Sequence, residues 1–393
     1  MGFVFYEFIN IKKGAPTMNF DLFDKNKERL QRARDFIQTE IEPLTDQIVR
    51  EDDIPSDLME KIARAGMLGI SVPKRYGGME ASNLDMILIA EELGKAGTVC
   101  AWPVFMNNSV AETLNFWGPD PVREKFIPPL CDGTSFACMG FTEPATGSDP
   151  RAIKTTAVPD GNGYRINGTK RYITNGNKKG YGLFFAKGPE KGLTAFLVDK
   201  KSDGYKVNRP WRFMALEGMN CVDVFLKDVY VPKENIVGEK GKGFAILLRW
   251  IAVERIQQAA YMVGIGQAAL DESVRFARKR IVSGRPLGHM QGFQWMLAEM
   301  KAKIDACRYL TYRAVCDQDK ERPVEALSAE LKIFVTPAIQ EVTRMALQIH
   351  GSYGYTRGFK VERLFRIAAH AGVTASSTEI NKSIAGSNIF RGN

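Results

Sequence analysis

The chain has 393 residues and a formal net charge of +9, with 45% hydrophobic and 25% charged residues. That composition is typical of a folded globular protein, and the length predicts two or three packed units. No apolar run approaches the roughly 18 residues of a membrane-spanning helix, so we expect no membrane segment. Six scattered cysteines without a C-x-x-C pair, and only three histidines, predict neither a metal site nor a disulfide framework. Reduced thiols in a cytoplasmic protein are expected instead.

The first residues, 1–18, are apolar first and basic afterwards, which is the reverse of a secretory signal. We interpret them as an N-terminal extension. Over 19–134, apolar residues recur at helical spacing, as in Leu30, Ala33 and Ile37. This pattern predicts an N-terminal helical domain.

Over 135–238 the chain changes to short β-prone runs, such as Tyr164–Ile166, Ala195–Val198 and Val222–Leu226, separated by Gly, Asn and Asp turns. This texture predicts a compact middle domain of antiparallel strands.

Helical periodicity returns over 239–393, first in a long segment from Phe244 to Val282 and then in further helices through Ile389. We expect a C-terminal four-helix bundle. The order of helices, strands and helices lacks βαβ alternation and a G-x-G-x-x-G fingerprint, which disfavours a Rossmann domain. The fold class expected is therefore α+β with several domains.

The turn-rich segment Phe141-Thr-Glu-Pro-Ala-Thr-Gly-Ser-Asp-Pro150 offers hydroxyls and backbone N–H groups. Tyr172-Ile-Thr-Asn175 follows and adds an aromatic face and another hydroxyl. Such donors suit a flavin ring edge or a pyrophosphate, although either segment alone is more often only a turn.

At these two segments the chain resembles the acyl-CoA dehydrogenase family of FAD flavoproteins. The likeness runs from about Asn19 to the end and includes Arg75-Tyr-Gly-Gly78. It implies FAD held between the β domain and the C-terminal bundle of a homotetramer. The residues that it places at the flavin are Phe141, Thr142, Gly147, Ser148, Tyr172 and Thr174.

The same resemblance implies further cofactor contacts near the C-terminus. Arg280 and Gln291 match positions from which a neighbouring subunit reaches the FAD pyrophosphate and adenine, with Ser283 where the family has Phe. Gln348 and Gly351 match an element beside the diphosphate. Ser377 and Glu379 match residues that face the cofactor region.

Dehydrogenation between the α- and β-carbons needs a carboxylate to remove the α-proton. In most of the family that group lies nine residues after an Arg matched here by Arg366, and the corresponding residue is Ala375. A branch that includes isovaleryl-CoA dehydrogenase places the carboxylate in a Glu-Arg pair on the first long C-terminal helix. Glu254-Arg255 matches that pair. Crotonobetainyl-CoA reductase resembles this chain in the same respect, because it also has a Glu-Arg pair on this helix. We therefore expect Glu254 to be the base; the alternative is an ion pair between Glu254 and a basic residue.

Trp102, Phe105 and Met106 fall where the family builds the floor of its acyl pocket, although aromatic residues are more often ordinary core. Bulk there favours a short, branched or cyclic acyl group. Ser148 and Arg255 complete the expected substrate contacts.

Three functions remain open from the sequence. The first is an FAD-dependent acyl-CoA dehydrogenase that passes electrons to an electron-transfer flavoprotein. The second is an enoyl-CoA reductase, or another flavin reaction on a thioester, in the same fold. The third is a nucleic-acid-associated or non-enzymatic flavoprotein, which the +9 charge suggests. The third is the weakest, since Lys and Arg are spread along the chain and the chain stops soon after the helix expected to face the flavin.

Overall fold

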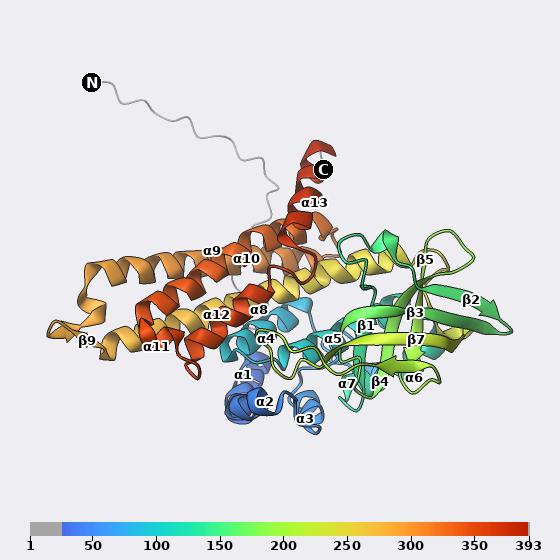
Figure 1. Cartoon of the computed structure of the whole chain (residues 1–393), viewed down its shortest axis with the longest axis horizontal. Helices are drawn as coiled ribbons and strands as arrows, with labels where there is room; N and C mark the ends of the chain where they lie inside the picture. Colours follow the sequence, from blue (N-terminus) through green and yellow to red (C-terminus); the bar gives the residue numbers. More distant parts are fainter. Residues whose placement is uncertain (1–25, 392–393) are drawn as a thin grey trace.

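The computed structural model describes residues 26–391, so the predicted extension 1–18 lies outside the described residues. Figure 1 shows three regions: helices from the first part of the chain, a sheet at one end, and long helices that extend away from the sheet. This arrangement confirms the expected fold class.

In its described part, the N-terminal region consists of helices and the loops that join them, without a strand. Its helices are α1 (Lys27–Phe36), α2 (Thr45–Glu51), α3 (Leu58–Arg64), α4 (Asn83–Ala96), α5 (Ala101–Trp117), α6 (Asp120–Phe126) and α7 (Pro128–Cys131). Helix α4 starts with a capping box in which the side chains and backbone amides of Ser82 and Asp85 bond reciprocally.

The middle region is an eight-stranded sheet in the order β6-β7-β3-β2-β4-β5-β8, with β1 paired to β4. Its pairs are antiparallel except β1 with β4 and β2 with β4. The strands are β1 (Phe136–Gly140), β2 (Thr156–Asp160), β3 (Gly163–Thr174), β4 (Gly180–Lys187), β5 (Leu193–Asp199), β6 (Tyr205–Val207), β7 (Cys221–Pro232) and β8 (Ile236–Val237).

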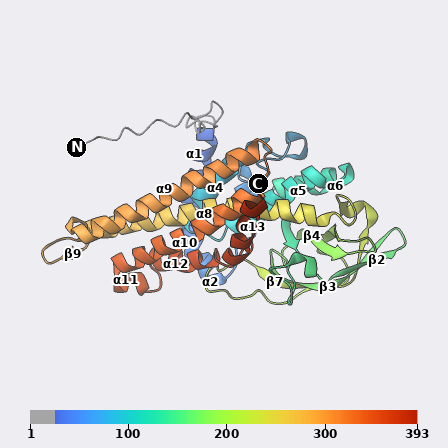
Figure 2. The same ribbon diagram turned by 90° about the horizontal axis from the view of Figure 1, so that it is seen from above.

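The C-terminal region consists of helices and one small hairpin. Its elements are α8 (Gly243–Lys279), β9 (Ile281–Val282), β10 (Arg285–Pro286), α9 (Gln291–Asp319), α10 (Glu325–His350), α11 (Ser352–Tyr355), α12 (Lys360–His370) and α13 (Thr378–Arg391). Figure 2 shows α8, α9 and α10 running alongside one another, with the β9 hairpin at the end far from the sheet.

The long helix ends earlier than its periodicity predicts. Helix α8 stops at Lys279, and Ile281–Val282 pairs with Arg285–Pro286 in the β9–β10 hairpin. Ser283 and Gly284 both have positive φ, 49° and 79°, which is the backbone of a two-residue hairpin turn. The turn residues therefore override the apolar pattern at 281 and 282.

The N-terminal and C-terminal helices share one hydrophobic core. A close crossing of α4 and α8 joins them: a Cβ added at Gly94 would lie 2.0 Å from the Tyr261 carbonyl oxygen, and one added at Gly264 would lie 2.0 Å from that of Glu91. Glycine at both positions allows the backbones to touch. This contact fixes α4, and the start of α5 after it, against the middle of α8.

Candidate active site

Three segments of the chain meet in the first half of α8. The ring of Phe141, just after β1, lies 6.0 Å from the ring of Trp250. Further along the helix, Arg255 Nε donates to the carbonyl oxygen of Ala375 at 3.2 Å, which holds the loop between α12 and α13 against α8. Glu254 is four residues from Trp250 and so shares its helix face. The β domain, α8 and the α12–α13 loop therefore converge around Glu254.

The carboxyl group of Glu254 has the acidity of a proton-transfer group. Burial raises the pKa of Glu254 to about 7, against the charges of Lys332 and Arg255, which lower it. No basic side chain of the described residues forms a direct ion pair with Glu254. A carboxyl with a pKa near neutrality can both take and give a proton at physiological pH.

Ala375 brings only a methyl group to the position where the family resemblance places the usual base. Ala375 and Ser376 have φ values of 50° and 69°, in the left-handed region that residues with side chains rarely adopt. Arg255 Nη2 donates to the Ser376 hydroxyl at 3.3 Å, in addition to its bond to Ala375. Contacts from α8 thus hold this loop in a strained shape.

The turn that follows Phe141 is fixed by a buried ion pair. The Glu143 carboxylate accepts from the N–H groups of Lys154 and Thr155 at 2.7 and 2.9 Å and from Lys170 Nζ at 2.9 Å. Lys170 is fully buried, and burial lowers its pKa to about 8 although the charge of Glu143 raises it. Burial opposes ionisation of Glu143 as well, yet the hydrogen bonds of Thr155 and the charge of Lys170 hold the pKa of Glu143 below its usual value.

Thr142 and Tyr172 lie on adjoining backbone. Arg171 N–H donates to the Thr142 carbonyl oxygen at 2.9 Å, and the pairing of β3 with β7 shifts register between Lys170 and Ile173. Tyr172 lies in this bulge with a φ of 60° and a side chain 53% exposed. The bulge turns an aromatic face outward beside the Phe141 turn. Thr174, at the end of β3, is partly buried.

A second network, which the sequence did not reveal, supports Tyr172. Asp223 of β7 accepts from Arg171 Nη2 at 2.7 Å and from the Trp211 indole at 2.9 Å. The rings of Trp211 and Phe213 lie 5.8 and 6.3 Å from that of Tyr172. Tyr172 is therefore one member of a fixed aromatic surface.

The groups near Phe141 fit a flavin. Gly147 and Ser148 are exposed, and open space surrounds the α-carbon of Gly147. The Trp250 indole N–H is buried and has no hydrogen-bond partner among the described residues. Exposed amide and hydroxyl donors, an unpaired indole donor and the face of Tyr172 suit a planar ring with acceptor atoms along its edge.

The remaining predicted cofactor residues divide into two groups. Ser377 and Glu379 lie at the start of α13, where Ser377 Oγ accepts from the N–H of Ile380 at 3.4 Å and Glu379 is exposed. They follow the loop that contacts Arg255 and so belong to the same region as Glu254.

The second group lies at the opposite end of the molecule. Arg280 follows the last residue of α8, and its guanidinium lies 6.0 Å from the Tyr353 ring. Gln291 begins α9, Gln348 lies in the last turn of α10, and Gly351 follows that helix directly. At 1.5 Å per residue, α8 places Arg280 about 45 Å from Trp250. Figure 1 shows this separation along the length of α8. One chain therefore does not bring the two groups together.

An aromatic cluster lies between α5, α8 and α12. The Trp102 ring is 4.9 Å from Tyr261, 5.1 Å from His370 and 5.9 Å from Phe105. Tyr261 is itself fixed by a 3.0 Å hydrogen bond to the Thr98 carbonyl oxygen. Bulky rings thus fill the place where the sequence predicts the floor of the acyl pocket.

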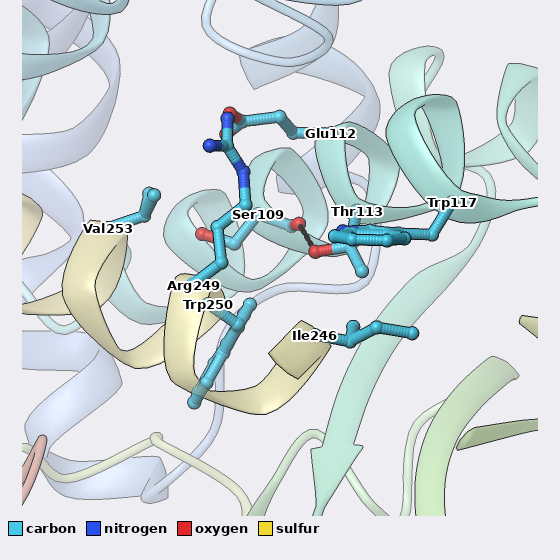
Figure 3. Close-up of a pocket in the computed structure, with 8 residues that line it drawn as sticks. All are labelled: Ser109, Glu112, Thr113, Trp117, Ile246, Arg249, Trp250 and Val253. Atoms are coloured by element: carbon cyan, nitrogen blue, oxygen red, sulfur yellow. Dashed lines mark hydrogen bonds and ion pairs between the residues drawn. The ribbon is translucent and has the colours of Figure 1, made fainter. Parts of the chain in front are cut away.

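A water-sized cavity of about 10 Å³ also lies between α5 and α8. Figure 3 shows its lining, with Arg249 beside Glu112. Their side chains form a 3.7 Å ion pair, and burial nevertheless raises the pKa of Glu112. The cavity holds about one water molecule and cannot take an acyl group.

Lys332 and His370 were not anticipated as members of this region. Lys332 lies within α10, where the nearest buried residues are apolar or small, and a lysine at such a position is ordinarily a surface residue. The only available signal is its spacing: Ser328 and Val335, which share the helix face of Lys332, are buried.

Family models match all three parts of the chain: the acyl-CoA dehydrogenase N-terminal domain at 24–134, the middle domain at 138–229 and the C-terminal domain at 241–390. The chain belongs to the acyl-CoA dehydrogenase family. Members of this family are flavoproteins and oxidoreductases that act on the CH–CH group of acyl-CoA.

Individual relatives of this acyl-CoA dehydrogenase family member extend over nearly its whole length. The 3-(aryl)acrylate reductase of Clostridium sporogenes is 34% identical, over 94% of this chain and 100% of its own. The solved butyryl-CoA dehydrogenase of Megasphaera elsdenii is 30% identical with a TM-score of 0.92, over 95% and 100%. A chain solved in work on the electron transferring flavoprotein of Acidaminococcus fermentans is 31% identical with the same TM-score and coverage. The relatives thus include both a dehydrogenase and a reductase.

Among residues 26–391, none of the helices combines the length and the apolar character that a membrane span requires. No cluster of His, Cys, Asp and Glu suited to a metal ion occurs there either.

Proposed function

We propose that this protein is an FAD-dependent oxidoreductase of a compact acyl-CoA thioester in which Glu254 exchanges the α-proton. The observation that carries the proposal is Glu254 itself, which lies where three segments meet and has a pKa raised to about 7 by burial. Ala375 has no group able to replace it. The placement resembles that of the isovaleryl-CoA dehydrogenase branch.

The residues near Glu254 would have separate roles in binding the flavin, transferring the proton and contacting the thioester. Phe141, Thr142, Gly147, Ser148, Tyr172 and Thr174 would hold the flavin ring, with Ser377 and Glu379 beside it. Bound FAD would supply the acceptor or donor of the hydride at the β-carbon. Glu254 would take the α-proton onto its carboxylate during oxidation of a saturated thioester, or donate it during reduction of an unsaturated one. Arg255, which fixes the Ala375 loop, and Ser148 would border the thioester.

Oxidation and reduction should show opposite dependences on pH. Oxidation requires ionised Glu254, so its rate should fall as the pH drops below about 7, where the carboxyl becomes protonated. Reduction requires the protonated acid, so its rate should fall as the pH rises above about 7. Single-turnover flavin bleaching with a saturated acyl-CoA, and reoxidation of reduced flavin by an enoyl-CoA, measure the two limbs. If both rates changed with pH in the same direction, proton transfer by Glu254 would be contradicted.

Aromatic packing supports a short, branched or cyclic acyl group. Trp102→Ala should remove the ring that contacts Tyr261 and His370 and lengthen the available space. We expect the ratio of kcat/KM for an eight-carbon over a four-carbon acyl-CoA to rise by roughly 10-fold, the lower end of the effect of one methylene in an apolar pocket. Phe116→Ala, a change at an exposed ring outside this cluster, is the control. An unchanged ratio in Trp102→Ala would show that these rings do not limit chain length.

The two separated groups of cofactor residues support assembly of several copies. Arg280, Gln291, Gln348 and Gly351 would reach the FAD of a neighbouring subunit, because on their own chain they lie at the far end of α8. The homotetramer that the family resemblance implies would bring these residues to the FAD of another subunit. An electron-transfer flavoprotein is the proposed redox partner, since a chain of very similar structure was solved in work on such a protein.

The reductase reading is favoured by the relatives that are named as reductases, the 3-(aryl)acrylate reductase among them. An anaerobic titration discriminates the readings. Bleaching by a saturated acyl-CoA supports dehydrogenation, and reoxidation of reduced flavin by an enoyl-CoA alone supports reduction. Salt-sensitive retention on DNA without either reaction would favour the nucleic-acid-associated reading suggested by the charge of +9.

A further inference from the structure

Lys332 is a buried cation that the proposed proton transfer does not use. It lies on α10 with only 2% of its surface exposed. Its ammonium donates to Gln258 Oε1 at 2.8 Å, to the Ala371 carbonyl oxygen at 2.7 Å and to the Thr374 carbonyl oxygen. All three donors of the ammonium group therefore have acceptors.

These acceptors belong to α8 and to the α12–α13 loop. Gln258 also donates through Nε2 to the Thr374 hydroxyl, so lysine and glutamine bind the loop to α8 together. Gln258 is four residues from Glu254 and shares its helix face. The clamp therefore closes directly beside Glu254 and before the strained Ala375.

Three ionisable groups interact with Lys332, namely Glu254 and Arg255 of α8 and His370 of α12. Burial lowers the pKa of Lys332 to about 7, while Glu254 raises it and Arg255 lowers it. Burial lowers the pKa of His370 to about 4, and Lys332 adds to that shift. His370 is thus neutral near pH 7. Glu254 is the one anion among the three.

We propose that Lys332 is a positioning residue for Glu254: it clamps the α12–α13 loop to α8 and supplies the positive charge that helps to keep the partly buried Glu254 carboxylate ionised. The inference rests on the proposed function, in which Glu254 exchanges the α-proton. The ammonium itself contacts neither the substrate nor the cofactor in this role.

Two kinds of variant separate the charge from the clamp. Lys332→Gln keeps hydrogen-bond donors but removes the charge, whereas Gln258→Met removes the amide and keeps the charge. If the charge ionises Glu254, its loss should raise the pKa of Glu254 by about 1 unit or more, as expected for a nearby opposite charge. Gln258→Met should leave that pKa almost unchanged.

The experiment is an infrared difference titration of the substrate-free, FAD-loaded protein between pH 5 and pH 9. The C=O band of protonated Glu254 is assigned by its loss in Glu254→Gln. The proposal expects the midpoint to rise in Lys332→Gln, with the same displacement in the pH profile of flavin bleaching. An unmoved midpoint, or an equal displacement in Gln258→Met, would overturn it.

A reciprocal measurement covers the case in which Lys332→Gln does not fold. Because coupling between two sites is mutual, Glu254→Gln should lower the pKa of Lys332 by a similar amount. The pH dependence of the lysine side-chain ¹⁵N resonance measures that pKa, and an unchanged value would refute the pairing. Failure of the proposed function is distinguishable, since flavin bleaching would then persist in Glu254→Gln whatever the titrations show.

Discussion

Glu254→Gln should nearly abolish bleaching of the bound flavin by a saturated acyl-CoA. The amide has almost the shape of the carboxylate but cannot accept the α-proton, and loss of a general base costs roughly 100- to 10,000-fold in rate. Binding should persist, because Arg255 and Ser148, the proposed thioester contacts, are unchanged. Stopped-flow absorbance of the flavin measures the rate, and quenching of its fluorescence measures binding.

Glu112→Gln is the matched control. Burial raises the pKa of this carboxyl as well, but its partner is Arg249 and it lines the water-sized cavity. It should bleach like the unchanged protein. Equal rates for Glu254→Gln and the unchanged protein would remove Glu254 from the proton transfer.

Lys170→Met should destabilise the protein and weaken its hold on FAD. Removing the lysine leaves the Glu143 carboxylate buried without its cation, which typically costs about 3–5 kcal/mol. Glu143 also fixes the backbone at Lys154 and Thr155, so the turn that carries Phe141 should loosen. Urea unfolding of the loaded protein, followed by circular dichroism and flavin fluorescence, measures both effects.

Arg165→Met provides the comparison, because Arg165 pairs with Asp160 at 2.7 Å but both side chains are nearly half exposed. Exposed ion pairs contribute only about 0–1 kcal/mol. A Lys170→Met variant no less stable than Arg165→Met would show that the buried pair does not hold the turn.

The sequence predicted the architecture well because the relevant signals are local. Strand runs such as Tyr164–Ile166 and Val222–Leu226 lie within β3 and β7, and helical periodicity recovered the order of the remaining elements. The end of α8 was missed because two turn residues outweighed the apolar pattern. The apolar pattern favoured a longer helix there, whereas the positive φ values of Ser283 and Gly284 formed a hairpin turn.

The site was predicted only in part, since its decisive contacts join distant segments. The expectation of Glu254 came from the family resemblance, but its raised pKa results from burial in the folded chain. Lys332 binds atoms 39 and 42 residues away, and neither acceptor is a side chain. Backbone carbonyl oxygens leave no trace in a sequence, so this clamp was invisible there.

Because α8 is so long, binding of FAD by the proposed enzyme should depend on association of its subunits. If the flavin end and the nucleotide end of each cofactor site come from different chains, affinity for FAD depends on how many chains are associated. Dilution of the protein should then cause FAD to dissociate as the subunits separate, and added FAD should promote their reassociation.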